Sequence, residues 1–304
     1  MANPDLPQPK KLRQTGQFQP RWEDLNVDCL ANVFGRVGIT ALLLSVPFVC
    51  KSWYRASLDS ACWQRLILPD VDTEIDLGNE GFWNSDNEIE AVIDRRPEIF
   101  RFDTLMSRFE QEYQTGHKCL SDTQFITFVV KRSRGQAIFL RLPPLCQITL
   151  LNRVADVCHG LKGLSLHRCS LIYSSSIILE LIGKCKHLEL LSLRGGSNNL
   201  EELLLQISIH CKKFCRLLVL NTVIGREDAL AIVNLVPNIK YLSLRKSYIH
   251  RDNLITLFRG CKELVLLDAR DCSGFDGGDV EILALASQID KFSCEGSRNG
   301  DWNS

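Results

Sequence analysis

The second half of the chain repeats one spacing of apolar residues, Leu-x-x-Leu-x-Leu or a close variant, at nearly constant intervals. Five consecutive intervals measure 27, 26, 25, 25 and 25 residues, which a chance run of leucines would not produce. A period of about 20–29 residues is typical of a leucine-rich-repeat solenoid, in which each unit buries its apolar face against the next. The copies begin at Leu161, Leu188, Phe214, Ile239, Leu264 and Ile289.

The spacing predicts one short strand per repeat. The first, fourth and sixth positions face the interior and the positions between them face out, because side chains alternate along a strand. A weaker copy at 137–142 begins 24 residues before Leu161, which makes seven strands. An apolar helix follows each strand, and we expect Asp252 and Asp279 to cap two of these helices.

Composition favours a soluble protein of the cytosol or nucleus. The 36 basic and 36 acidic residues cancel, so no net charge attracts the chain to nucleic acid or anionic lipid. The longest apolar stretch, 41–50, is shorter than the roughly 20 residues that a membrane span needs. The first residues also lack the apolar core of a signal peptide.

The 13 cysteines follow the repeat rather than a disulfide pattern. Cys158, Cys185, Cys211 and Cys261 each precede a repeat by three residues, which predicts buried, reduced thiols. The run His-Cys-Lys-Lys-Phe-Cys at 210–215 has metal-binding residue types but no second pair of ligands. We predict no metal and no cofactor. Cys119 and Cys146 fall outside the repeat grid, so we expect them to react first with thiol reagents.

Residues 21–68 predict a separate helical module with one informative run, Val46-Pro-Phe-Val-Cys-Lys-Ser-Trp53, followed ten residues later by Trp63. Together with Leu25-Asn-Val-Asp28 and Val33-Phe34, this run resembles the F-box motif. Its pairing with cysteine-containing leucine-rich repeats is similar to the plant F-box/leucine-rich-repeat family. Asn26 stands where that family usually has proline.

The resemblance implies a fold, a partner and a role. The fold is α/β, with a three-helix F-box followed by a curved solenoid that has a parallel sheet and convex helices. The F-box would dock a Skp-type adaptor and, through it, a cullin-RING ubiquitin ligase. The positions that build or contact the docking surface would be Leu25, Val33, Phe34, Val37, Leu43, Val49 and Trp53.

The boundaries follow from these patterns. We expect a disordered tail at 1–20, the F-box at 21–68, a linker at 69–98, the solenoid with its capping segment at 99–294 and a second tail at 295–304. From Asp70 to Asp94 the linker carries nine acidic residues and no Lys or Arg, which predicts a solvated loop. A functional acidic patch is the alternative.

The sequence contains no catalytic arrangement that we recognise. The six histidines include no pair at metal-ligand spacing, and there is no phosphate loop or nucleophile elbow. The chain is therefore interpreted as a substrate-recognition adaptor of an SCF-type ubiquitin ligase, without enzymatic activity. The alternative is a stand-alone repeat scaffold.

The substrate surface is predicted from the outward positions of the strands. The seventh position of successive repeats is often cationic, which suits an acidic or phosphorylated peptide. A solvated face of mixed charge is the alternative, because Asp268, Asp271 and Glu295 lie among these residues. The predicted substrate-binding residues are His167, Arg194, Tyr241, Arg245 and Arg270.

Overall fold

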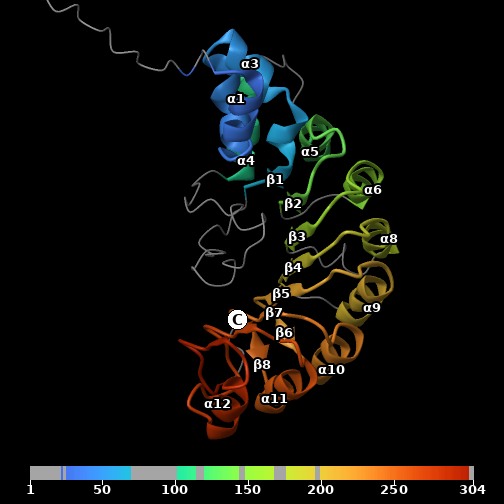
Figure 1. The fold of residues 1–304 in the computed structure, drawn as a ribbon, viewed down its shortest axis with the longest axis vertical. Coiled ribbons are helices and arrows are strands. Elements are labelled where there is room, and N and C mark those ends of the chain that lie inside the picture. Colours follow the sequence, from blue (N-terminus) through green and yellow to red (C-terminus); the bar gives the residue numbers. More distant parts are fainter. Residues whose placement is uncertain are drawn as a thin grey trace, which may run out of the picture.

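The computed structural model describes residues 22, 25–69, 101–113, 120–143, 148–167, 176–195 and 199–300. Over these ranges the chain is an α/β protein in which a group of N-terminal helices precedes a long parallel sheet (Figure 1). The predicted N-terminal tail, the acidic residues of the linker, and Cys119 and Cys146 lie outside the described residues.

The N-terminal helices are short, and local sequence sets their ends. They are α1 (Val27–Phe34), α2 (Gly38–Leu44), α3 (Lys51–Ser57) and the 3₁₀ turns η2 (Val46–Phe48) and η3 (Ser60–Trp63). The side chain of Asn26 caps α1 by accepting a hydrogen bond from the Cys29 amide at 2.7 Å. Asn26 has a φ of −65°, the angle that a proline would hold. The exchange of proline for asparagine therefore keeps the backbone angle and adds a cap.

Helix α4 (Phe102–Glu112) packs against this N-terminal group. The hydroxyl of Tyr113, directly after α4, donates to the Leu43 carbonyl at 3.1 Å, and the Phe48 and Tyr113 rings meet edge to face at 5.6 Å. Phe109 stacks on Tyr113 and also meets Phe125 of the next helix edge to face. The N-terminal helices and the first repeat thus share one apolar core.

The main sheet is parallel and has the strand order β1-β2-β3-β4-β5-β7-β9-β10. It contains a strand in each of the seven repeats where the spacing predicts one. The sequence analysis missed β1, which belongs to the N-terminal module and pairs with β2 at the edge of the sheet. The strands are β1 (Arg65–Ile67), β2 (Phe139–Arg141), β3 (Gly163–His167), β4 (Leu190–Arg194), β5 (Arg216–Leu220), β7 (Tyr241–Ser243), β9 (Leu266–Asp268) and β10 (Lys291–Ser293).

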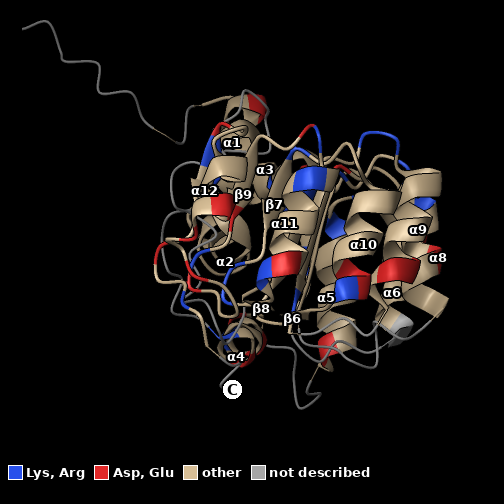
Figure 2. Cartoon of the chain, turned by 90° about the horizontal axis from the view of Figure 1, so that it is seen from below, with Lys and Arg blue, Asp and Glu red and all other residues tan. Residues whose placement is uncertain are grey.

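One helix follows nearly every strand, and together these helices line the outer side of the arc in Figure 1. Figure 2 shows Lys, Arg, Asp and Glu interspersed over them, as expected of a solvated surface. A small second sheet pairs β6 (Val223–Ile224) with β8 (Tyr248–Ile249). The helices are α5 (Asp122–Arg132), α6 (Ile148–Val157), α8 (Ser176–Lys184), α9 (Leu200–His210), α10 (Arg226–Leu235), α11 (Arg251–Gly260) and α12 (Val280–Ala286).

One of the two predicted caps is correct. Asp279 caps α12 by accepting hydrogen bonds from the amides of Glu281 and Ile282. The other expectation, Asp252, is wrong because α11 begins at Arg251, so that Asp252 already lies in its first turn. His250 is the cap there, and its ring nitrogen accepts from the Asp252 amide at 3.3 Å.

The repeat positions predicted to face the interior are buried in every repeat but the last, where Ile289, Phe292 and Cys294 are partly buried, and the four cysteines that precede the repeats are buried as well. The Cys211 thiol donates to the Cys185 carbonyl of the preceding repeat at 3.4 Å. Cys272 donates in the same way to the Leu244 carbonyl at 3.0 Å. A cysteine therefore fills a small slot and also satisfies a backbone acceptor of its neighbour.

A left-handed residue follows the sheet strand in five consecutive repeats. Each occupies the eighth position of its repeat, where the chain turns out of the sheet, and two of the five are glycines. They are Gly195, Asn221, Lys246, Asp271 and Gly296, with φ between 53° and 82°. Ordered structure also continues past the predicted boundary at 294, since the Arg298 amide bonds the Cys272 carbonyl at 3.1 Å. None of the described helices is long and apolar enough to cross a membrane.

Candidate interaction surfaces

The N-terminal helices leave several large apolar side chains in solvent. Val33 of α1 is 40% exposed, and Val49, which follows η2, is 58% exposed. Both were predicted to build or contact the docking surface. The structure places them on segments that pack against α3. Several exposed apolar groups on one small module suit a protein-binding surface.

The other predicted docking residues lie deeper. Phe34 and Leu43 are 2% and 1% exposed, so they build the module and are not available for direct contact. Leu25, Val37 and Trp53 are half-buried against the same core, and the Trp53 ring meets Phe34 edge to face at 5.0 Å.

Three exposed apolar residues of this module were missed by the sequence analysis. Val27 is 44% exposed, Phe48 52% and Tyr54 48%. Val27 stands next to polar residues at the start of α1. Phe48 belongs to the run at 46–53, whose spacing does not show which of its side chains face solvent. We call the exposed set Val27, Val33, Phe48, Val49 and Tyr54 the module surface.

The second surface is the inner face of the sheet, opposite the helices. Parallel pairing aligns its side chains into rows, since Leu190 pairs with Arg216, Arg216 with Tyr241, and Tyr241 with Leu266. A second row aligns His167, Arg194 and Leu220. Neighbours in a row lie on adjacent strands about 4.8 Å apart. Of the predicted substrate residues, the pairings align His167 with Arg194 in one row and place Tyr241 in the other, while Arg245 and Arg270 follow β7 and β9 outside the strands.

The arginines of this face are largely withdrawn from water. Arg194 is 5% exposed and Arg216, which the sequence analysis missed, is 3% exposed. The Arg216 guanidinium lies over the Tyr241 ring at 4.8 Å from its centre. Arg216 could have been found from the sequence, because it occupies an outward position of its strand, between the interior positions of the repeat.

Acidic side chains pair with Arg245 and Arg270, two of the predicted substrate residues. Arg270 makes a forked contact with Asp268, at 2.9 Å from Nε and 2.8 Å from Nη2. Arg245 Nε lies 3.5 Å from an Asp271 carboxylate oxygen. These two ion pairs give the surface mixed charge where the chain leaves β7 and β9.

Apolar side chains make up another part of the inner face. They form a buried cluster separate from the main core, and the half-buried Ile67 and Tyr241 pack against it. Every described member of this cluster belongs to a strand of the main sheet. We call it the inner apolar cluster: Phe139, Leu190, Leu218, Leu220 and Leu266.

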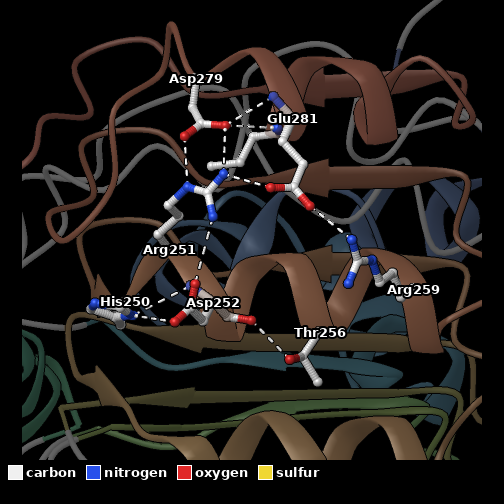
Figure 3. Close-up of polar contacts among 8 residues, drawn as sticks. His250, Arg251, Asp252, Thr256, Arg259, Asp279 and Glu281 are labelled. Carbon is white, nitrogen blue, oxygen red and sulfur yellow. Dashed lines mark hydrogen bonds and ion pairs between the residues drawn. The ribbon is translucent and has the colours of Figure 1, made fainter.

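A polar network joins the last two helices (Figure 3). Arg251 donates to Asp279 at 2.7 Å and to Glu281 at 2.6 Å, and Arg259 reaches the other Glu281 oxygen at 2.7 Å. The Arg251 guanidinium, together with the amides at the start of α12, lowers the pKa of Asp279 below its usual range. Because these groups pair with one another across α11 and α12, the network holds the terminal repeat in place.

The chemistry of the described residues suits binding. Burial raises the pKa of Cys185 and Cys272 to about 12 and that of Cys158, Cys211 and Cys261 to about 11. Thiols so rarely ionised at neutral pH are poor nucleophiles. Within the described ranges, no three His, Cys, Asp or Glu side chains gather as metal ligands would.

The chain is similar in sequence to several curated plant proteins that are described as F-box or F-box/LRR-repeat proteins. The chain is 25% identical to the F-box protein FBW2 of Arabidopsis thaliana over 83% of this chain and 68% of that protein. It is 23% identical to the putative F-box/LRR-repeat proteins 22 and 9 of the same plant, over 95% and 88% of this chain and 81% and 93% of theirs. No protein-family model matches. The similarity extends over most of the chain and supports the plant F-box/leucine-rich-repeat family.

Proposed function

We propose, from this similarity to plant F-box/leucine-rich-repeat proteins, that the chain is the substrate receptor of an SCF-type ubiquitin ligase. In this proposal residues 21–68 form an F-box that docks a Skp-type adaptor. Residues 99–294 form a leucine-rich-repeat solenoid whose inner face holds a protein substrate. The adaptor in turn links the chain to a cullin and to the ubiquitin-loaded enzyme.

The observation that carries the proposal is the module surface. The five side chains of the module surface are each 40% or more exposed, on a module of fewer than 50 residues whose buried apolar groups belong to the main core. Keeping apolar groups in water is unfavourable by about 25 cal/mol per Å². A partner that covers the module surface removes this penalty, and the exposed pattern lies where the F-box resemblance implies the adaptor.

The mechanism needs no reacting side chain from this protein. Holding a substrate next to the ubiquitin-loaded enzyme replaces a bimolecular encounter with an effectively intramolecular one, at effective concentrations of the order of millimolar. The structure supports a fixed geometry for such a tether. Strand β1 of the module pairs with β2 of the first repeat, and Tyr113 bonds the Leu43 carbonyl.

The test replaces the two most informative side chains of the module surface. We expect Val33→Gln with Val49→Gln to weaken binding of a purified Skp-type adaptor by roughly a hundredfold or more, since truncating an interface anchor commonly costs about 1–3 kcal/mol. The measurement is titration calorimetry. The matched control is Leu205→Gln with Ile209→Gln on α9, which are 43% and 50% exposed and far from the module.

The outcomes separate the two candidate functions. Loss of adaptor binding in the module variant alone supports the ligase receptor. If the wild-type chain binds no Skp-type adaptor, or if both double variants bind it equally well, the stand-alone scaffold is the better description. Circular dichroism of both variants confirms that each one is folded.

The inner face is the proposed substrate surface, with His167, Arg194, Tyr241, Arg245 and Arg270 as candidate contacts for an acidic or phosphorylated segment. Arg245→Glu should weaken substrate capture without changing adaptor binding. Lys262→Glu, an exposed residue in the turn after α11, makes the same charge change away from this face. Quantitative mass spectrometry of proteins that accumulate when the chain is removed would identify the substrate.

A further inference from the structure

The last repeat leaves apolar side chains in solvent at the end of the array. Val280 is 82% exposed and Leu283 is 46% exposed, both on α12, which Figure 1 places at the end of the arc farthest from the N-terminal helices. Glu281 of the same helix bonds Arg251 and Arg259 of α11, so its side of α12 faces α11. At about 100° per residue, Leu283 lies on the opposite side of the helix. It therefore points past the end of the array.

In the two preceding repeats, the residue equivalent to Leu283 is covered by the repeat that follows. The equivalents are Phe258 of α11 and Val233 of α10, at intervals of 25 residues. Val233 lies so close to Gly260 of α11 that a Cβ atom on the glycine would overlap it. The Phe258 ring meets the Phe292 ring edge to face at 5.3 Å. Leu283 has the same place in its repeat, and no described helix follows it.

The sheet has an open edge at the same end. Strand β10 is the last in the strand order, and no described strand pairs with its outer edge. The Lys291 amide and the Ser293 carbonyl both bond toward the preceding repeat. Because successive peptide groups of a strand point to opposite edges, the amides of Phe292 and Cys294 point outward. Unpaired amides of this kind are a template for another strand.

A second copy of the chain can supply that strand. Two copies of one strand related by a two-fold axis pair antiparallel, so each contact occurs twice. When the outward groups of Phe292 meet those of Cys294 of the second copy, Lys291 falls opposite Glu295 of the second copy. Both side chains are exposed. They would form a non-hydrogen-bonded pair, the type in which side chains approach most closely, with Cα atoms about 4.5 Å apart.

Charge complementarity favours this occupant and this register. A lysine on an edge strand ordinarily opposes pairing, whereas a carboxylate directly opposite makes the same pairing favourable. Moving the register by one pair in either direction would place Lys291 opposite Ser293 or Ser297, without a carboxylate. The exposed side of α12 also carries no charge, so nothing on it repels an identical helix: Val280, Leu283, Ala284 and Ser287.

We propose that the chain forms a symmetric homodimer through this end, in which β10 pairs antiparallel with β10 of a second copy. The two sheets then join into one, and the exposed sides of the two α12 helices pack against each other behind the joined edge. The N-terminal helices lie at the two far ends of such a dimer. Any meaning of this for ubiquitin transfer rests on the proposed function. The dimer itself does not.

The experiment measures the mass of the full-length chain by sedimentation equilibrium from about 1 μM to about 100 μM, which brackets a weak symmetric interface. The test variants are Lys291→Glu and Glu295→Lys, and the control is Lys213→Glu, exposed in the turn before β5. We expect the wild type and the control to dimerise equally. Each test variant should dimerise at least about tenfold more weakly, because both ion pairs become contacts between like charges.

Mixing the two test variants provides the decisive measurement. One chain then carries carboxylates at positions 291 and 295 and the other carries ammonium groups, so both pairs are attractive again. We expect the equimolar mixture to recover dimers with an affinity close to that of the wild type, which no folding defect could produce. Leu283→Gln should weaken the dimer as well, whereas Leu230→Gln on α10, at a side chain 39% exposed, should leave it unchanged.

Several results would overturn the proposal. They are a wild-type chain that stays monomeric over the whole range, a dimer that survives both charge reversals, a mixture that stays monomeric, and assemblies larger than a dimer, since a two-fold interface closes at two copies. Hydrogen exchange gives an independent reading. The amides of Phe292 and Cys294 should exchange more slowly as the wild-type concentration rises, and rates that do not depend on concentration would contradict the pairing.

Discussion

A methyl group at Gly260, the last residue of α11, would collide with Val233 of α10. A Cβ atom built there lies 2.3 Å and 2.4 Å from the two γ carbons of Val233 and 2.8 Å from its β carbon. Rotating the valine would leave the contact with its β carbon, so the two helices must move apart. Overpacking of this kind costs about 1–3 kcal/mol. Alanine in place of glycine in a helix returns about 0.5–1 kcal/mol, so the middle of both ranges leaves a net loss of about 1.3 kcal/mol for Gly260→Ala.

The same geometry predicts a smaller loss in a second background. With Val233→Ala in place, the two γ carbons are gone and only the 2.8 Å approach to the β carbon remains, so Gly260→Ala should destabilise this background clearly less than it destabilises the wild type. The four proteins of this double-mutant cycle are compared by urea unfolding followed by circular dichroism, with midpoints read at a common slope. A Gly260→Ala protein as stable as the wild type, or one equally destabilised in both backgrounds, would refute the reasoning.

Three further predictions follow from described contacts. Cys185 and Cys272, whose thiol pKa is raised to about 12, should react with iodoacetamide at pH 8 far more slowly than the exposed Cys29, as read by peptide mass spectrometry; equal rates would contradict their burial. Asp279 has a lowered pKa in the folded chain, so its stabilising effect is present above the ordinary value of 3.8 and is lost as pH falls through the lower folded value; wild type and Asp279→Asn should therefore differ in urea midpoint at pH 7 and converge near pH 2. Asn26→Ala should destabilise the N-terminal helices by about 1 kcal/mol through loss of the cap, and a melting temperature unchanged from wild type would argue against that bond.

The strands of the repeats could be predicted because the spacing of apolar residues in each repeat marks the positions that face the interior. Leu164 and Leu191, like their equivalents in every repeat but the last, are fully buried where the spacing places them. Strand β1 could not be predicted in this way. It is only three residues long, it lies outside the repeat, and its pairing with β2 depends on how the N-terminal helices dock.

The sequence predicts which residues belong to the candidate surfaces better than it predicts which of their side chains face solvent. The F-box resemblance gave a list of apolar positions, yet solvent reaches Val33 and Val49 and not Phe34, because helix packing decides which side of each turn is covered. On the inner face the register aligns His167 with Arg194 and Arg216 with Tyr241, as the repeat spacing predicts. The ion pairs of Arg270 with Asp268 and of Arg245 with Asp271 depend on side-chain rotamers that strand register alone does not determine.

The pairing of β1 with β2 also sets an order of events during synthesis. Arg65 and its partner Phe139 are 74 residues apart (139 − 65). At about 5–20 residues per second, the ribosome needs roughly 4–15 s to make the intervening chain, whereas short helices form in microseconds. For that interval the N-terminal helices can form while Leu66 and Leu68, both 0% exposed in the finished protein, have no sheet to join. A nascent chain of this protein therefore passes through a stage with an unpaired apolar strand, at which a chaperone would bind and at which truncated products would aggregate.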